Sequence, residues 1–485
     1  MLADNGLKLK IDTPTTIIIF GVTGDLSQQK LLPALFDLHR RGALPTKFCI
    51  VGFSRRTWGD EEFKQFVEQT LSRDKHRHTK KELNAFKRHL VFQGGDFGEL
   101  NDFHELGDKL SLIDKKLGVR SNKLFHLAVS PSLYGIIFAG LAKSKLNLSG
   151  VEKNKYWVRL LVEKPFGQDI KTAQRLDERL AKFFNEEQIF RIDHYLTKET
   201  VQNILAFRFS NRLFEPIWNS DYIERVEINL LETRDVGNRV NFYDGIGALR
   251  DVGQSHALQM LALIAMDEPE NMAADIIRDA RANVMRDLVS IGKRDIQTNL
   301  VRAQYDKYQE EKNISPNSPT ETYFQLKAKL NNKRWRSVPF YITAGKALDR
   351  DEVKIKIYFK AAKHCFACDI AKGQECPQNS VIFNIQPQEG IAVDFWVKKP
   401  GLEMELIKKE LSFYYSEFEK ARHNLPNAYE ILLYNAMRGD QTNFASSKEL
   451  KYSWKYITKI LKNWQNAPLQ IYPKGSGGPK NKLIG

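Results

Sequence analysis

One short segment of the chain, residues 191–199 (R-I-D-H-Y-L-T-K-E), concentrates side chains that can do chemistry. It supplies a carboxylate, an imidazole, a phenol and an ammonium, from Asp193, His194, Tyr195 and Lys198. An alternating run over residues 188–193 predicts a strand, and the apolar periodicity of residues 197–211 predicts a helix after it. A helix start offers unpaired N–H groups and a positive dipole, so Lys198 is poorly placed there unless an anion binds beside it. We expect a phosphate-type anion at this helix start, and a solvated helix end is the alternative.

A second candidate for chemistry lies in a predicted helix over residues 247–266. His256 shares one face of this helix with leucine, valine and methionine side chains, so a core histidine is one interpretation. Its polar neighbours favour another interpretation, and they are Arg250, Asp251, Gln254 and Ser255. Because an imidazole titrates near neutral pH, a histidine in such company is typical of a general base.

A glycine turn near the N-terminus is typical of a dinucleotide-binding loop. A β-branched run over residues 16–20 leads directly into G-V-T-G-D-L (21–26), and a helix is expected from Ser27. Gly21 allows a tight turn, and Gly24 lets the backbone approach a pyrophosphate. The spacing is G-x-x-G, with Ser27 in place of a third glycine, so the motif alone is a weak signal.

The end of the second predicted strand, residues 48–53, indicates which dinucleotide is bound. Arg55 and Arg56 follow it, where an NAD site usually has an acid for the ribose 2′-hydroxyl. A guanidinium suits a 2′-phosphate instead, and Thr23 can add a hydroxyl contact. These residues predict NADP, and two surface arginines in a loop are the alternative.

The pattern of elements divides the chain at residue 192. Before it, short apolar runs alternate with helical patterns, which is typical of a parallel sheet; further strands are expected at 90–93, 123–129 and 157–162. Beyond it, alternating runs predict antiparallel strands at 223–232, 353–362, 380–386 and 390–398, with helices at 271–290, 428–437 and 448–465 between or after them. We expect an α/β, Rossmann-like NADP-binding domain over 1–192. We expect an α+β substrate-binding and oligomerisation domain with a mostly antiparallel sheet over 193–485.

Composition and charge limit the class of protein. A chain of 485 residues with 42% hydrophobic residues is too long for one ordinary core and predicts two globular domains. It contains no run of about 18 apolar residues and no signal-type apolar region near its start, so we expect no membrane span and a cytoplasmic location. The net charge of +15 favours anionic partners, but the basic residues are mixed with 59 acidic ones, so we expect no nucleic-acid partner. The basic tail 474–485 is expected to be flexible.

The cysteines leave one question open. Cys49 lies alone in a predicted strand and is expected to be a small core residue. The other three, Cys365, Cys368 and Cys376, cluster between two predicted strands. Their spacing is compatible with a structural zinc ion, with His364 or Asp369 as a fourth ligand, with free thiols or with a redox disulfide.

These segments, taken together, resemble the glucose-6-phosphate dehydrogenase family almost from end to end. The resemblance is carried by G-V-T-G-D-L-S-Q-Q-K (21–30), V-G-F-S-R (51–55), E-K-P-F-G (163–167), R-I-D-H-Y-L-T-K-E (191–199), R-D-V-G-Q-S-H (250–256), G-K-A-L (345–348), N-I-Q-P-Q-E-G (384–390), K-K-P-G (398–401) and N-A-M-R-G-D-Q-T-N-F (435–444). Three positions depart from the family's pattern, at Ser130, Thr197 and Gly253. None of these departures removes a chemical group, so they bear on loop geometry and not on the reaction.

The resemblance implies an enzyme that oxidises D-glucose 6-phosphate to 6-phospho-D-glucono-1,5-lactone and reduces NADP, the first step of the oxidative pentose phosphate pathway. It implies that His256 is the general base and that Asp193 orients its imidazole. It also implies a homodimer or homotetramer and no metal ion at the catalytic site. Another NADP-linked, two-domain sugar oxidoreductase is the alternative.

The resemblance assigns binding residues position by position. The substrate contacts that it implies are Lys164, His194, Tyr195, Lys198, Glu232, Asp251, Lys346 and Gln386. The coenzyme contacts that it implies are Gly21, Thr23, Gly24, Asp25, Leu26, Arg55, Tyr134 and Lys164. Whether a second, structural NADP site exists is left open.

Overall fold

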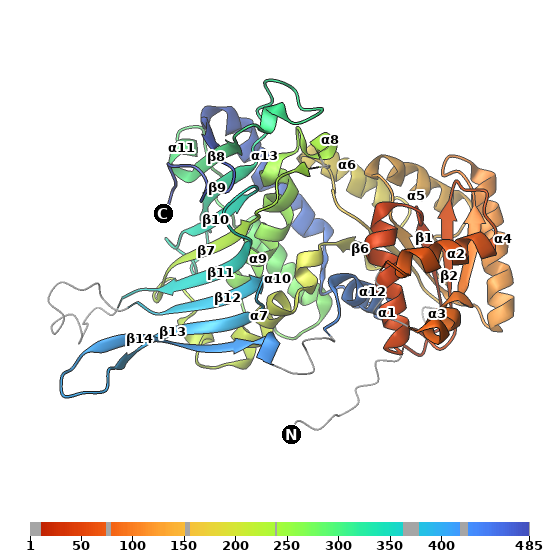
Figure 1. Cartoon of the computed structure of the whole chain (residues 1–485), viewed down its shortest axis with the longest axis horizontal. Helices are drawn as coiled ribbons and strands as arrows, with labels where there is room; N and C mark the ends of the chain where they lie inside the picture. Colours follow the sequence, from red (N-terminus) through yellow and green to blue (C-terminus); the bar gives the residue numbers. More distant parts are fainter. Residues whose placement is uncertain are drawn as a thin grey trace. The chain divides into compact units, whose positions relative to one another are not determined.

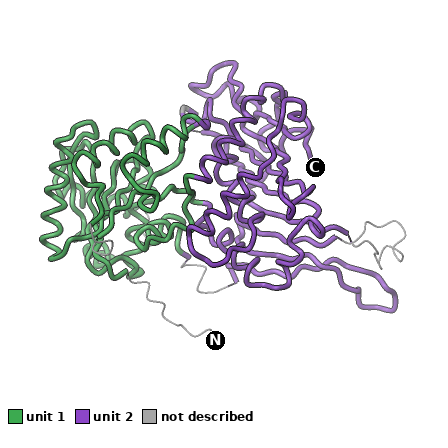
Figure 2. Tube along the Cα trace, turned by 180° about the vertical axis from the view of Figure 1, so that it is seen from behind, with its two compact units in different colours: residues 1–167, 171–194, 426–447 green, residues 168–170, 195–425, 448–485 purple. Residues whose placement is uncertain are grey.

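The structure, a computed structural model, describes residues 11–73, 79–150, 156–237, 240–361, 378–417 and 425–484 (Figure 1). It divides the chain into two compact units, which Figure 2 distinguishes by colour. Unit 1 consists of residues 1–167, 171–194 and 426–447, and unit 2 of residues 168–170, 195–425 and 448–485. The division therefore falls inside the R-I-D-H-Y segment, between His194 and Tyr195.

Unit 1 is built on a seven-stranded sheet in the order β15-β6-β5-β4-β1-β2-β3. Its strands are β1 (Thr15–Phe20), β2 (Phe48–Ser54), β3 (Leu90–Gly94), β4 (Asn122–Leu127), β5 (Val158–Val162), β6 (Ile189–Ile192) and β15 (Phe444–Ala445). Its α-helices are α1 (Leu32–Arg40), α2 (Asp60–Leu71), α3 (Lys80–Lys87), α4 (Leu100–Leu117), α5 (Tyr134–Lys143), α6 (Ile170–Ala181) and α12 (Ala428–Arg438). Strands β1 to β6 pair in parallel, and β15 joins β6 antiparallel. The predicted Rossmann-like architecture is confirmed.

Both faces of this sheet are buried under helices. Ile17 and Ile19 of β1 belong to one core cluster with residues of α1, α2, α3 and α12. Phe20 points to the opposite face, where its ring centroid lies 6.1 Å from that of Phe103 on α4. Because β1 is buried on both faces, its sequence is continuously apolar and does not alternate.

A return of the chain at residues 426–447 completes unit 1, and the sequence pattern did not predict it. β15 extends the sheet beyond β6, with Phe444 opposite Ile192. The guanidinium of Arg159 donates to the carbonyl oxygens of Ala436 and Met437, at 2.8 and 2.7 Å. The predicted boundary at residue 192 does not include this segment, because strand addition by a distant part of the chain leaves no local signal.

Unit 2 is an α+β unit built on a nine-stranded sheet in the order β14-β13-β12-β11-β7-β10-β9-β8-β16. Its strands are β7 (Ile223–Leu231), β8 (Leu300–Tyr305), β9 (Tyr323–Ala328), β10 (Phe340–Gly345), β11 (Glu352–Phe359), β12 (Ser380–Gln386), β13 (Gly390–Lys398), β14 (Leu406–Tyr414) and β16 (Leu469–Tyr472). Its helices include α7 (Glu199–Ser210), α8 (Val240–Tyr243), the π-helix η7 (Leu249–Ala257), α9 (Leu258–Ala265), α10 (Ala274–Arg286), α11 (Ile296–Asn299) and α13 (Ser447–Asn463). Neighbouring strands are antiparallel except β7–β10 and β8–β16, which confirms a mostly antiparallel sheet.

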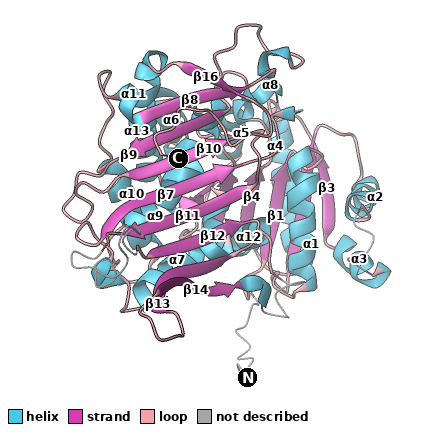
Figure 3. Ribbon diagram, turned by 60° about the vertical axis from the view of Figure 1, so that its left-hand side comes forward, coloured by secondary structure: helices cyan, strands magenta, loops and turns pink. Residues whose placement is uncertain are grey.

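One face of the nine-stranded sheet carries helices. Figure 3 shows α7, α9 and α10 together on one side of the strands. α7 contacts β12, and η7 contacts β10. The helix η7, which carries His256, therefore packs on this sheet through β10.

The last residues of the chain correct one expectation. The tail 474–485 was expected to be flexible, but its described part is bonded into unit 2. The Gly475 N–H donates to the Ala347 carbonyl at 2.8 Å, and the Asp349 N–H donates to the Ser476 carbonyl at 3.0 Å. The prediction of a flexible end is wrong because it used composition alone. The partners that fix this segment lie more than 100 positions away in the sequence, at Ala347 and Asp349.

Several helices of unit 1 are amphipathic, whereas every residue of α9 in unit 2 is buried. α4 is one of the longest and buries Phe103, Leu106, Leu110 and Ile113 along one face. Across the described part of the chain, no helix combines the length and the apolar character that crossing a membrane requires.

Candidate functional site

The loop after β1 has the geometry of a dinucleotide-binding turn. Gly21 has a φ of +81°, and a Cβ there would lie 2.5 Å from the carbonyl oxygen of Ala128, which follows β4. The Gly24 N–H donates to the Gly21 carbonyl at 2.9 Å, which closes the turn. Ser27, in the place of a third glycine, is buried and donates its hydroxyl to the same carbonyl at 3.1 Å. Only glycine fits at position 21, and the serine stabilises the turn without widening it.

This loop lies at the switch point of the sheet, where β1 separates β4 from β2. Ligands of such sheets bind outside the carboxyl ends of the strands at that point. Thr23 and Gly24 are partly exposed, Asp25 is exposed, and Asp25 and Leu26 begin the helix that continues as η1 (Ser27–Leu31). The main chain here offers an open cradle for a pyrophosphate.

Arg55 and Arg56 follow β2, and the surroundings of their side chains differ. The guanidinium of Arg56 lies 5.8 Å from the ring centroid of Trp58. Arg55 is exposed, and among the described residues it has neither a carboxylate nor an aromatic ring as partner. Arg55 is therefore the arginine available to a 2′-phosphate, whereas Arg56 covers an indole.

The loop that carries Lys164 is anchored through the residue before it. The hydroxyl of Tyr134 donates to the carbonyl oxygen of Glu163 at 2.9 Å. The carboxylate of Glu163 meets His126 Nε2 at 3.1 Å and the hydroxyl of Tyr429 at 3.3 Å. Tyr134 is fully buried, and burial raises the pKa of its phenol, so it is a neutral donor that positions this loop. Lys164 itself is partly exposed at the end of β5.

Asp193 and His194 are the last residues of unit 1 before the chain continues into unit 2 at Tyr195. Both follow β6 directly, and Asp193 is 3% exposed. The preceding Arg191 is buried and holds β6 in place through Asp177 at 2.5 Å and Glu186 at 2.8 Å. The strand predicted at 188–193 is confirmed as β6, and an ion cluster around the buried Arg191, which the sequence did not predict, fixes its end.

Three predicted site residues meet in unit 2. The rings of Tyr195 and His256 stack with centroids 4.2 Å apart and an interplanar angle of 23°. Lys198 Nζ lies 4.9 Å from the centroid of the Tyr195 ring. Tyr195 and His256 are buried, and Lys198 is partly exposed. One phenol ring thus joins the imidazole and the ammonium, which are 58 positions apart in sequence (198 to 256).

The position of Lys198 explains its electrostatics. It is the residue that precedes the first turn of α7, where the expected helix begins two residues later than predicted. Burial lowers the pKa of Lys198 to about 8, and the carboxylate of Glu389 opposes that shift. The side chain of the N-cap residue Lys198 does not cap the helix, so the positive end of the helix dipole and the Lys198 ammonium lie together where an anion could bind.

The helix that carries His256 is a π-helix at that point and not an α-helix as predicted. In η7 the backbone hydrogen bonds span five residues, which is the separation of Asp251 and His256. Such segments are frequent at functional sites. The predicted α-helical spacing would place the two residues on different faces, whereas one π-turn brings them to the same side.

A buried carboxylate that the sequence did not single out fixes the start of η7. Glu321 Oε1 accepts the Leu249 N–H at 3.0 Å, and its carbonyl oxygen accepts the Ala248 N–H at 3.1 Å. Gly247 has a φ of +76°, and a Cβ there would lie 2.3 Å from Glu321 Oε1. Burial raises the pKa of Glu321 to about 7. The two acceptors and the glycine set where the π-helix begins.

Four further predicted residues lie at or near one edge of the nine-stranded sheet, the edge formed by the carboxyl ends of β7, β10 and β12. Because β7 and β10 are parallel neighbours, Glu232 and Lys346 leave them at the same edge and form an ion pair. Gln386 ends β12 in the same row as Leu230, two interstrand spacings or about 10 Å from it. Burial, and after it the carboxylates of Glu321 and Asp251, raise the pKa of the Tyr243 phenol, whose ring lies 5.7 Å from Lys346 Nζ. η7 therefore contributes to this edge and to the Tyr195 stack.

The polar neighbours of His256 have structural tasks as well. Arg250 donates to the carbonyl oxygens of Gln168 and Ile246, at 3.2 and 3.0 Å. Gln254 donates to the Ser453 hydroxyl at 2.8 Å, which ties η7 to α13. A Cβ at Gly253 would lie 3.0 Å from the Phe324 ring, so the mid-helix glycine permits close packing on β9. The polar company of His256 is thus explained partly by packing.

The cysteine predictions have different outcomes. Cys49 is buried in β2, and burial raises the pKa of its thiol to about 12, which confirms a core cysteine. Cys365, Cys368 and Cys376, together with His364 and Asp369, lie outside the described residues. Zinc, free thiols and a disulfide therefore all stay predictions for that cluster.

Comparison with known proteins agrees with this geometry over the whole chain. The family profile described as "Glucose-6-phosphate dehydrogenase, NAD binding domain" matches residues 18–203, and "Glucose-6-phosphate dehydrogenase, C-terminal domain" matches residues 205–483. The glucose-6-phosphate 1-dehydrogenase of Aggregatibacter actinomycetemcomitans is 39% identical over 482 residues, covering 96% of this chain and 95% of the relative. The Bacillus subtilis enzyme of the same name is 35% identical, covering 98% and 97%. A solved structure titled "Glucose-6-phosphate dehydrogenase in complex with its substrate glucose-6-phosphate" has a TM-score of 0.88 at 32% identity, covering 97% of this chain and 96% of that one.

The two arginines after β2 offer a matched pair of variants. Arg55→Ala should raise the KM for NADP by about 10–100-fold, since it removes a charge-assisted contact to the 2′-phosphate, and should leave the KM for NAD nearly unchanged. Arg56→Ala, the control, should change neither value much because its guanidinium covers Trp58. Steady-state kinetics with both coenzymes measure this. An equal effect of Arg55→Ala on both coenzymes would contradict the assignment.

Proposed function

The chain belongs to the glucose-6-phosphate dehydrogenase family, and we propose that it oxidises D-glucose 6-phosphate to 6-phospho-D-glucono-1,5-lactone with NADP as hydride acceptor. The observation that carries this proposal is the stack in unit 2. There the Tyr195 ring contacts both the imidazole that would take a proton and the ammonium that would bind a phosphate. A sugar phosphate needs both functions at a fixed separation.

In this proposal His256 is the general base. It removes the proton of the C1 hydroxyl while the C1 hydride leaves, so that C1 becomes the lactone carbonyl. A neutral imidazole suits this step at neutral pH. Asp193 is assigned, by the family resemblance, to orient that imidazole and to stabilise its protonated form. The support for this role is positional: His256 is buried and its ring is held face to face with the ring of Tyr195, so the imidazole has a fixed place in the site.

The substrate phosphate is assigned to Lys198, His194 and Tyr195. An ammonium in front of an uncapped helix start provides charge and N–H dipoles for it. The sugar hydroxyls are assigned to Lys164, Glu232, Asp251, Lys346 and Gln386, the last four of which share the sheet edge described above. Binding energy at the phosphate would position C1 for the reaction, because fixed orientation lowers the entropic part of the barrier.

The coenzyme is assigned to the loops at the switch point of unit 1. Gly21, Thr23, Gly24, Asp25 and Leu26 would hold the pyrophosphate, and Arg55 the 2′-phosphate. The cradle fits such a group, since a side chain at Gly21 would collide with Ala128. The bound nicotinamide supplies the hydride acceptor. Tyr134 would act through the Glu163 carbonyl to place Lys164.

Three finer assignments stay predictions that rest on the family alone. They are a role in the first step of the oxidative pentose phosphate pathway, a cytoplasmic location, and assembly as a homodimer or homotetramer. The domain boundary at residue 192 likewise stays a prediction.

A direct assay tests the function. Absorbance at 340 nm should rise with NADP and glucose 6-phosphate, and far more slowly with free glucose. His256→Asn should lower kcat by about 10²–10⁴-fold with a small change in KM, because it removes proton transfer but keeps the shape of the site. Equal rates with glucose and glucose 6-phosphate would contradict the phosphate site and favour another sugar oxidoreductase. Near-normal turnover of His256→Asn would contradict its role as base.

The pKa of Lys198 predicts a pH dependence of substrate binding. Its ammonium is charged below pH 8 and neutral above it, so the KM for glucose 6-phosphate should rise about ten-fold between pH 7 and pH 9. Lys198→Arg should abolish this rise because a guanidinium stays charged. Glu389→Gln should move the rise to lower pH, since that carboxylate supports the ammonium. A KM that is independent of pH in the wild type, or a rise that persists in Lys198→Arg, would contradict the assignment.

A further inference from the structure

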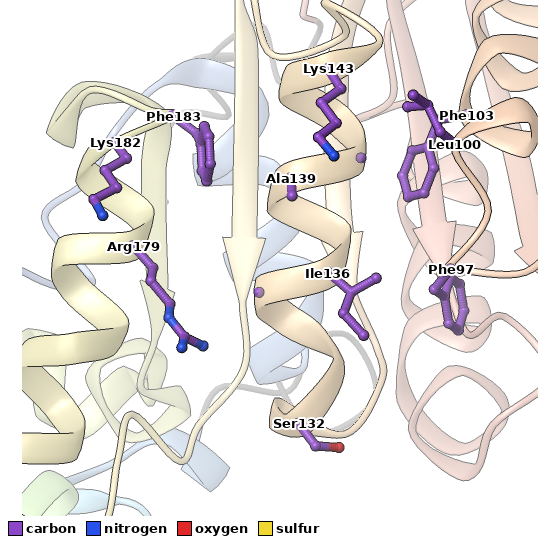
Figure 4. Close-up of a pocket in the computed structure, with 13 residues that line it drawn as sticks. Phe97, Leu100, Phe103, Ser132, Ile136, Ala139, Lys143, Arg179, Lys182 and Phe183 are labelled. Carbon is purple, nitrogen blue, oxygen red and sulfur yellow. The ribbon is translucent and has the colours of Figure 1, made fainter.

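A groove runs along the outer face of α5 in unit 1, away from the coenzyme loop. It has a volume of about 490 Å³. On α5 the groove follows Gly135, Ile136, Ala139 and Gly140, which lie one helical turn apart or side by side (Figure 4). Because several side chains on this stripe are small or absent, the surface of α5 is recessed here relative to the elements on either side of it.

One wall of the groove is aromatic. Phe97 and Phe103 come from the loop after β3 and from α4, and both are largely buried. A Cβ at Gly140 would lie 2.4 Å from the Phe103 ring, so the glycine allows this ring to pack directly on α5. Leu100 and Ile136 remain 38% and 45% exposed at the rim. The groove therefore offers an apolar surface of the kind that small ligands bury.

The other wall is cationic. Arg179 on α6 and Lys182 directly after it form this wall, Lys143 extends from α5 itself, and the lining contains no carboxylate (Figure 4). Within the described residues none of the three forms an ion pair, although the chain carries 59 acidic residues. Arg179 is held close to α5, because its Nη1 would lie 3.2 Å from a Cβ at Gly135. Three such cations beside one apolar groove give that groove a positive potential, which favours an anionic ligand.

The groove is separate from the coenzyme cradle. Its lining includes Ser132 and Gly135, which lie two positions before and one position after Tyr134, but not Tyr134 itself. Tyr134 points to the interior, where its ring packs against Phe138 and its hydroxyl reaches Glu163. Gly21, Gly24 and Arg55 are also absent from the lining. A molecule in the groove would touch the outer face of the helix whose inner face holds the Glu163 loop.

We propose that this groove binds a small organic anion, one that has an aromatic or branched aliphatic body and a phosphate or carboxylate group. The apolar body lies along the exposed side chains of Leu100 and Ile136, beside the edge of the Phe97 ring. The anionic group lies at Lys143, Arg179 and Lys182. The volume fits a molecule of this class and is small for a folded partner.

Isothermal titration calorimetry on the full chain tests this proposal with 1-naphthyl phosphate and 1-naphthoate as probes. NADPH and glucose 6-phosphate are present at saturation, which blocks the coenzyme and substrate sites. The variant Arg179→Glu/Lys182→Glu reverses two groove charges. Its matched control, Lys171→Glu/Arg175→Glu, makes the same change on exposed residues of α6 that do not line the groove. Ile136→Asp is a second groove variant that leaves the cations intact.

We expect both probes to bind the wild type and the control alike. Both groove variants should bind at least about ten-fold more weakly, because charge and apolar contact are needed together. Inorganic phosphate and 1-naphthol, which each carry half of the chemistry, should bind at least about ten-fold more weakly than 1-naphthyl phosphate. Equal affinity in the groove variants and the control, equal affinity for inorganic phosphate, or no binding to the wild type would each overturn the proposal. None of these results depends on the proposed dehydrogenase activity.

Discussion

The ring of Tyr195 contacts both functional groups of the proposed site. Its centroid lies 4.2 Å from the centroid of the His256 imidazole and 4.9 Å from Lys198 Nζ. The two functional groups therefore lie no farther apart than these two distances together. A rigid ring between them sets their separation in a way that two flexible side chains would not. In the proposed reaction, this ring defines the distance between the phosphate end of the substrate and the carbon that is oxidised.

The rest of unit 2 holds that stack in place. Glu321 and Gly247 fix the first residue of η7, and Gly253 lets the helix lie close to Phe324 of β9. The π-turn then sends Asp251 and His256 to the same side, so one helix serves the sheet edge and the stack. The parallel pairing of β7 with β10 in an otherwise mostly antiparallel sheet brings Glu232 and Lys346 to that edge. Unit 1 uses a different device, in which the turn at Gly21 and the loop after β4 meet at the switch point.

Local sequence patterns predicted a large part of this arrangement. β12 and β13 have the predicted bounds, because each alternates and has one buried face. The strands between residues 300 and 345 were missed, since β9 is buried on both faces and carries no alternation. The cap by Glu321, the return of residues 426–447 and the π-helix were also missed. Each depends on contacts between distant parts of the chain, or on a change of hydrogen-bond register that α-helical periodicity does not reveal.

The most direct test of the central claim compares Tyr195→Phe with Tyr195→Leu. The phenylalanine variant keeps the ring and loses only the hydroxyl, so kcat should stay near the wild-type value while the KM for glucose 6-phosphate rises. The leucine variant loses the ring that holds the imidazole and the ammonium at a fixed separation, so kcat should fall by about ten-fold or more. The account is contradicted if Tyr195→Leu keeps the wild-type kcat, or if Tyr195→Phe lowers kcat as far as Tyr195→Leu does.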